Sequence, residues 1–217
     1  MKAKSSGETI NVNGPDGPTS VLIFDRNKKL SFRQKFLKFM VQTKRKFFEK
    51  RIKAEPHSID EVCEFLTSVL KFTELPKTDE RYIEEYKATR VSFIMQHKPE
   101  LMGDFARMPE LKDYTEEAYL KHMEEFNLRK KVAEAVPVEL YDIDLHMFRK
   151  VEGENESRIS IEKTYSMISG GASGTPRYTK KFNKVYKRIY KYYGVTQADI
   201  DNKTERYKDL LSTLSVH

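Results

Sequence analysis

Lysine and arginine gather on one side of a predicted helix at residues 176–191, where they form a surface suited to binding phosphate groups. At about 100° per residue, the cations fall within one arc and the apolar and aromatic residues within the opposite arc. This stretch holds seven basic residues and no acidic one. Because like charges three or four positions apart repel one another, a helix face selected for stability alone usually mixes acids among its cations. We predict phosphate contacts from Lys180, Lys184, Lys187, Arg188 and Lys191.

A second basic helix is predicted from Ser31, its N-cap, to about Lys53. From Arg33 to Lys53 there are nine basic residues and one acid, Glu49. The apolar residues of this helix form two strips, so we expect it to contact two neighbours, or one neighbour and a partner. If the two basic helices lie side by side, the cationic surface is extended by Arg33, Lys35, Lys38, Lys44, Arg45 and Lys46.

The two basic segments together carry +15, which exceeds the formal net charge of +7 for the whole chain. Charge separated in this way creates a field that attracts a polyanion. Nucleic acid is the first candidate partner, an acidic protein the second and an anionic membrane surface the third. Phosphate contacts would give affinity without sequence selectivity. Tyr178 and Tyr190 are the aromatic residues that could reach a base, although Tyr178 also lies on the apolar side of the helix, where core packing is its alternative role. The alternative is a solvated face that offsets the acidic remainder of the chain.

A metal site is the second chemistry that the residue spacing suggests. Asp142, Asp144 and His146 alternate along a predicted strand, so their side chains would point to one face. Two carboxylates and an imidazole can bind a divalent cation, and Glu162 on the partner strand could join them. The alternative is the solvent face of an edge strand, where charge discourages aggregation.

Catalysis has little support in the sequence. A nuclease would need a glutamate and a lysine on one strand face, whereas Glu162 and Lys163 are adjacent and would face opposite sides. The glycine-rich residues 169–174, predicted to be a flexible loop, could hold a phosphate at the following helix, but they match neither the P-loop nor the dinucleotide-binding fingerprint. The only cysteine, Cys63, lies on the predicted core side of its helix. We therefore expect a non-catalytic binding or interaction protein with no cofactor.

The remaining pattern predicts an α+β fold, a mainly helical single domain with about six helices and a small antiparallel hairpin or three-stranded sheet. Residues 1–18 read as a flexible tail, residues 19–217 as one globular domain, and Val21–Phe24 as a short strand. Capping residues begin helices at Ser58, Asp79, Thr115 and Thr196, and the alternation at residues 141–148 and 159–167 predicts a hairpin with one buried and one wet face. The first eighteen residues are polar and contain no apolar signal stretch, which predicts a cytoplasmic protein. The sequence contains no run of about 20 apolar residues, so we expect no transmembrane span.

Three parts of the chain resemble a small, uncharacterised family of bacterial cytosolic proteins. The first is Gly17-Pro18-Thr19-Ser20, the second is Pro56-His57-Ser58-Ile59-Asp60-Glu61-Val62, and the third comprises Tyr192-Tyr193-Gly194-Val195 with Asn202-Lys203-Thr204-Glu205-Arg206-Tyr207. Some members carry labels as subunits of a sodium-translocating decarboxylase, which would be a membrane protein. The resemblance implies a bacterial source and a free-standing cytosolic domain, and it implies no activity and no site.

Overall fold

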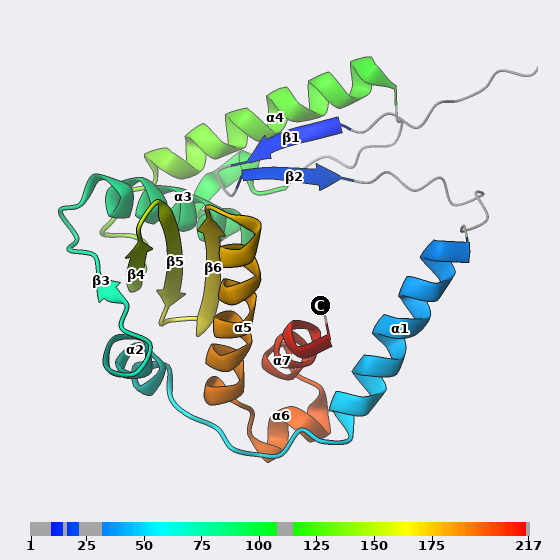
Figure 1. The fold of residues 1–217 in the computed structure, drawn as a ribbon. Coiled ribbons are helices and arrows are strands. Elements are labelled where there is room, and N and C mark those ends of the chain that lie inside the picture. The colour runs from blue at the N-terminus through cyan, green and yellow to red at the C-terminus, as the bar shows by residue number, and fades with distance from the viewer. Residues whose placement is uncertain (1–9, 15–16, 22–31, 108–114, 216–217) are drawn as a thin grey trace, which may run out of the picture. The chain divides into compact units, whose positions relative to one another are not determined.

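The computed structural model describes residues 10–14, 17–21, 32–107 and 115–215 (Figure 1). The chain divides into two compact units, Met1–Ile52 with Leu214–His217, and Lys53–Thr213, and each is described by itself. It is an α+β protein dominated by helices, as predicted. The described residues form seven α-helices, one 3-10 helix and six strands, so there are more helices than the six expected. The single domain predicted for residues 19–217 stays a prediction.

The first unit contains a hairpin and the first basic helix. Strands β1 (Ile10–Gly14) and β2 (Gly17–Val21) are antiparallel, with Gly14 opposite Gly17. The hairpin therefore begins inside the segment for which a flexible tail was predicted. Helix α1 spans Phe32–Glu49. Residues 22–24 of the predicted strand and the predicted cap at residue 31 lie outside the described residues.

The second unit is built around a four-stranded antiparallel sheet in the order β3-β4-β5-β6. The strands are β3 (Thr73–Glu74), β4 (Leu145–Glu152), β5 (Asn155–Glu162) and β6 (Met167–Ser173). The predicted hairpin corresponds to β4 and β5, which meet at a turn where Gly153 has a φ of +63°. Residues 169–173, predicted to be a loop, belong to β6 instead, so that prediction was wrong.

The sheet packs on both faces, whereas one wet face was predicted. On one face, Leu145 and Met147 are buried in a cluster with Tyr82 and Phe93. The register sets Phe148 opposite Ile159, and both side chains are buried on the other face. Strand β4 therefore places hydrophobic side chains on both faces of the sheet. A helix covers each face, and the helix on the first face is the one that contains Tyr82 and Phe93.

The helix on the second face is α5 (Pro176–Tyr193), which lies against β6 (Figure 1). The hydroxyl groups of Tyr186 and Tyr190 both donate to the carbonyl oxygen of Ile168, at 3.2 and 2.9 Å. A Cβ atom on Gly170 would lie 2.6 Å from Ile159 Cδ1 and 3.2 Å from Tyr186 Cε2. The glycine in β6 thus permits the close approach of α5 to the sheet.

Most predicted caps are confirmed. Ser58 and Glu61 form a capping box at α2 (Ile59–Ser68), and Asp79 caps α3 (Glu80–His97). The 3-10 helix η1 (Pro99–Phe105) follows, and Thr115 caps α4 (Glu116–Ala135). The single last helix predicted from Thr196 is divided into α6 (Gln197–Asn202) and α7 (Glu205–Ser215), because Lys203 adopts a left-handed conformation with a φ of +49°.

Arg206 joins three segments at the end of α5. Its guanidinium donates to the carbonyl oxygens of Gly194, His57 and Tyr193 at 2.9, 2.9 and 2.6 Å, and it lies 3.7 Å from the centre of the Tyr193 ring. Gly194 has a φ of +57°, and a Cβ atom there would lie 2.1 Å from the carbonyl oxygen of Glu55. These contacts, here called the Arg206 junction, fix the position at which α5 ends. They also bring together residues from two of the segments that carry the family resemblance.

Candidate polyanion-binding surface

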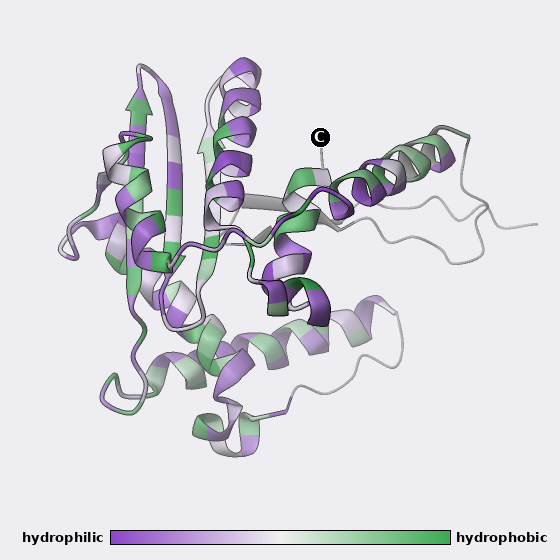
Figure 2. Ribbon diagram, turned by 90° about the horizontal axis from the view of Figure 1, so that it is seen from below, coloured by the Kyte–Doolittle hydropathy of each residue, from purple (hydrophilic) through white to green (hydrophobic). Residues whose placement is uncertain are grey.

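The predicted division of α5 into an apolar and a cationic side is confirmed. Five aromatic or aliphatic side chains of α5 are buried, namely Tyr178, Phe182, Ile189, Tyr190 and Tyr193. Hydrophilic residues recur along the length of the helix (Figure 2). The exposed cations, here called the α5 cationic face, are Arg177, Lys180, Lys181, Lys184, Arg188 and Lys191. Lys187, also predicted to bind phosphate, is partly buried.

Most cations of the α5 cationic face have no ion-pair partner among the residues that the structure describes. Within the part of the chain that the structure describes, no carboxylate forms an ion pair with Arg177, Lys180, Lys184 or Lys191. Lys181 is the exception, since its ammonium lies 2.5 Å from a carboxylate oxygen of Glu152. This hydrogen bond holds the pKa of Glu152 below its ordinary value. Arg188 is partly occupied as well, because its guanidinium lies 5.3 Å from the centre of the Phe65 ring.

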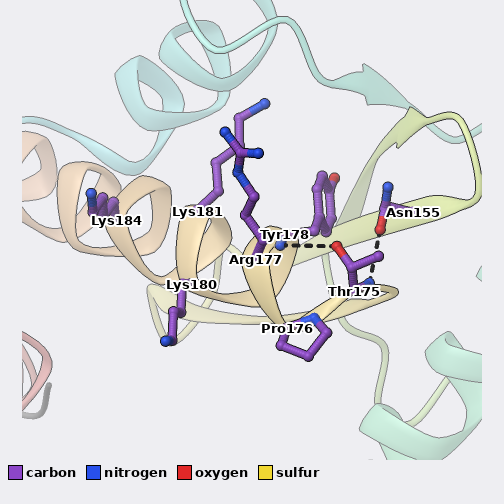
Figure 3. Close-up of a pocket in the computed structure, with 8 residues that line it drawn as sticks. All are labelled: Asn155, Thr175, Pro176, Arg177, Tyr178, Lys180, Lys181 and Lys184. Atoms are coloured by element: carbon purple, nitrogen blue, oxygen red, sulfur yellow. Dashed lines mark hydrogen bonds between the residues drawn. The ribbon is translucent and has the colours of Figure 1, made fainter.

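A shallow depression of about 840 Å³ opens beside the first turns of α5 (Figure 3). Its lining is strongly basic and contains Asn155, Thr175, Pro176, Arg177, Tyr178, Lys180, Lys181 and Lys184. Two of the backbone amides at this helix end, those of Thr175 and Tyr178, already have partners. Thr175 Oγ1 accepts from the amide of Tyr178 at 3.2 Å, and the amide of Thr175 donates to Asn155 Oδ1 at 2.9 Å. The side-chain cations, rather than the glycine-rich segment before the helix, therefore supply the positive charge of this depression.

A smaller cavity of about 230 Å³ adjoins the first and shares Tyr178 and Lys181 with it. Lys71 and Lys150 line this cavity, and Lys150 donates to the carbonyl oxygen of Leu70 at 2.9 Å. Sequence reasoning missed both lysines because one lies in a connection and the other in a strand. Only the pairing of β4 with β5 brings Lys150 opposite Ser157, whose hydroxyl group contacts that of Tyr178 at 3.0 Å.

The two tyrosines predicted to reach a base are buried instead. Tyr178 and Tyr190 are each 8% exposed, and both hydroxyl groups are engaged inside the protein. Tyr192 is stacked between His57 and Phe65, with ring centres 3.9 and 4.1 Å apart. None of the six aromatic side chains of α5 is exposed. The α5 cationic face therefore presents charge and offers no aromatic platform for stacking.

The cations predicted in the first basic helix belong to the other compact unit. Lys35, Arg45 and Lys46 are exposed on α1, and Lys44 is partly exposed. For Arg33 and Lys38 the structure describes the helical backbone and not the side chains. An extension of the α5 cationic face by α1 stays a prediction.

The predicted metal-binding residues do not gather in one cluster. Asp142 and Asp144 precede β4 instead of alternating along it, and the hydroxyl group of Tyr86 donates to Asp142. His146 lies between two carboxylates, with Nδ1 2.6 Å from Glu74 and Nε2 3.2 Å from Asp144. Among the described residues, no three histidine, cysteine, aspartate or glutamate side chains are arranged to hold a metal ion.

The fourth proposed ligand, Glu162, is also placed elsewhere. The register sets it opposite Leu145, so it faces away from His146, and it is 2% exposed. Its carboxylate accepts hydrogen bonds from the amides of Asp144 and Tyr165 at 3.3 and 2.8 Å. Strand β4 is an inner strand between β3 and β5, which also contradicts the interpretation as a charged edge. The buried carboxylate of Glu162 therefore holds two backbone amides at the end of the sheet.

Burial raises the pKa of the Cys63 thiol to about 11, so the thiolate is scarce at neutral pH. None of the helices in the described ranges is both long and apolar enough to cross a bilayer. Comparison of the chain with protein-family models, with curated proteins and with solved structures found no match. The candidate site therefore rests on its own geometry.

Proposed function

We propose that this chain is a non-catalytic binding protein whose α5 cationic face engages the phosphate backbone of nucleic acid. The observation that carries the proposal is the set of exposed cations on one rigid helix for which the described residues offer no ion pair: Arg177, Lys180, Lys184 and Lys191. A helix of 18 residues is about 27 Å long, so these cations run beside several successive phosphates of a duplex.

The burial of the aromatic side chains of α5 favours double-stranded over single-stranded nucleic acid. Proteins that hold single strands without sequence preference stack bases on exposed aromatic rings. The α5 cationic face has no such ring, since Tyr178 and Tyr190 are buried under it. Contacts restricted to phosphates position a duplex without reading its sequence.

Salt-dependent binding of the purified protein to labelled duplex and single-stranded DNA tests the proposal. Engagement of about six phosphates predicts a log–log slope near −5 on duplex DNA, and roughly a thousandfold loss of affinity between ~50 and ~200 mM salt. The double variant Lys180→Gln/Lys184→Gln removes two unpaired cations and should reduce the steepness of the slope by about 2.

The matched control is Lys121→Gln/Lys131→Gln, which removes the same charge from exposed positions of α4. It should leave the slope unchanged, because α4 mixes acids among its cations. An absence of duplex binding at ~50 mM salt would overturn the proposal in favour of an acidic protein partner or a solvated face. Equal losses in the two double variants would show that net charge acts without a defined site.

A further inference from the structure

Helix α1 carries an apolar stripe that has no cover in the described structure. Five large side chains share an arc of about 100° at 100° per residue, and hydrophobic residues recur along the helix (Figure 2). Their exposed fractions are 86% for Phe32, 54% for Phe36, 62% for Phe39, 39% for Met40 and 47% for Phe47. Water contact with so many aromatic rings on one side of a helix is unfavourable, and such a patch marks an interaction surface.

The stripe is free of unsatisfied polar groups. Within α1, which ends at Glu49, Thr43 is the only polar residue inside the arc, and its hydroxyl group donates to the carbonyl oxygen of Phe39 at 2.9 Å. The lone acid of the helix, Glu49, lies about 130° from the centre of the stripe. An apolar medium could therefore contact the stripe without burying a charge or an unpaired hydroxyl group.

Cations border the stripe on both sides. Lys35 and Lys46 lie roughly 20 to 40° beyond one edge, and Lys44 lies about 40° beyond the other. Arg51 follows the end of the helix. The guanidinium of Arg51 is 3.9 Å from the centre of the Phe47 ring. Long basic side chains in this position can leave their charged ends in a polar layer while their alkyl parts follow the apolar surface.

We propose that α1 is an interfacial helix that lies in the plane of an anionic phospholipid bilayer. Its aromatic stripe would enter the boundary between headgroups and acyl chains, and Lys35, Lys44, Lys46 and Arg51 would contact lipid phosphates. Charge decides between this partner and a second copy of the chain. Two stripes packed together would bring their bordering cations close to one another, whereas anionic headgroups neutralise them. The inference concerns α1 alone and does not rest on the function proposed for α5.

Flotation of the full chain with vesicles tests the inference. The protein should float with mixed phosphatidylcholine and phosphatidylserine vesicles and remain unbound to pure phosphatidylcholine. Phe36→Ser/Phe39→Ser should lower partitioning by roughly tenfold to a hundredfold, since each ring loses its apolar burial in the lipid. Lys35→Gln/Lys46→Gln should lower it by about fivefold for each cation.

The matched control is Leu120→Ser/Leu128→Ser, which removes two exposed apolar side chains from α4, at 57% and 48% exposure. It should float as the unmodified chain does, and so should Lys180→Gln/Lys184→Gln on α5. Because the chain contains no tryptophan, Phe39→Trp provides a single emission reporter. Its emission should shift to shorter wavelength with the anionic vesicles, while that of Leu128→Trp should not.

Three results would overturn the inference. The first is an absence of flotation, which would favour a protein partner for the stripe. The second is a marked loss of stability in Phe36→Ser/Phe39→Ser without vesicles, because it would place the stripe inside the protein. The third is a dimer in solution that these two substitutions dissociate, which would make a second copy the occupant.

Discussion

Helices α1 and α5 are both 18 residues long and both strongly basic, but they differ in the exposure of their apolar residues. None of the rings of α5 is exposed, and the hydroxyl groups of Tyr186 and Tyr190 are bonded to the sheet, so the helix presents mainly charge at its surface. The rings of α1 are exposed beside its cations. A rigid array of charge suits a stiff polyanion, whereas exposed rings bordered by cations suit a lipid interface. Basic composition alone therefore does not identify a ligand. The burial or exposure of the apolar face is what distinguishes the two helices.

The largest expected effect tests whether the apolar faces differ as described. Ile189→Ala removes a side chain that is 0% exposed, and it should lower the free energy of unfolding by about 2 to 5 kcal/mol. Phe39→Ala on α1, where the ring is 62% exposed, should change it by less than about 0.5 kcal/mol. Urea unfolding followed by circular dichroism measures both. Similar losses in the two variants would remove the contrast between the helices.

A smaller effect is expected at the end of α5, where the Arg206 junction holds the helix. Gly194→Ala and Gly153→Ala both place a Cβ atom on a backbone with positive φ, which costs about 1 to 2 kcal/mol in the left-handed region. The cost is larger at Gly194, where ψ is −161°, a conformation that is nearly restricted to glycine. Only the alanine at 194 meets a neighbour, the carbonyl oxygen of Glu55 at 2.1 Å, whereas nothing lies within 4 Å at 153. The melting temperature should therefore fall further for Gly194→Ala. Equal melting temperatures would show that the backbone at Glu55 moves away without cost and that the junction does not hold α5.

The smallest expected effect concerns the ion pair that neutralises one cation of α5. Glu152→Gln removes the carboxylate that pairs with Lys181, so duplex DNA affinity should rise by about twofold to fivefold at low salt. The Lys181 hydrogen bond depresses the pKa of Glu152 below its ordinary value of 4.5. The ion pair between Glu152 and Lys181 is therefore fully formed at pH values above 4.5, and it is lost as the pH falls through the lowered pKa of Glu152. Affinity of the unmodified chain should accordingly rise with acidification in that range, and the variant should lack this part of the response. Vesicle binding through α1 should not change in the variant, and a parallel rise there would show that the two surfaces are not independent.

Local signals in the sequence predicted the helices well because capping and periodicity are local. Ser58 and Thr115 marked helix starts that the structure confirms, and the two sides of α5 followed from their spacing. Strand β6 escaped prediction because its glycines have low strand propensity, and its place depends on pairing with β5 and on contact between Gly170 and Tyr186. The division at Lys203 also escaped, since a single left-handed residue breaks the predicted helix into α6 and α7.

The candidate site was predictable in charge and not in detail. Spacing placed Lys180 and Lys184 on the exposed side of α5, as observed. Spacing could not show that Glu152 neutralises Lys181, because the two residues meet only through the packing of α5 against the sheet. Glu162, the optional fourth metal ligand, lies apart from His146 for a related reason. The register of two strands, which neither strand reveals alone, set Glu162 on the face opposite to His146.

The Arg206 junction also constrains the order in which the second unit is completed. The guanidinium of Arg206 holds the carbonyl oxygen of His57, 149 positions earlier in the chain. During synthesis from the N-terminus, residues 53–58 emerge early, whereas Arg206 follows His57 only 149 positions later. The contact of Arg206 with the segment before α2 therefore forms late, after the contacts of His57 with Tyr192 and Tyr193 have become available, and it locks an end of α5 that is already in place.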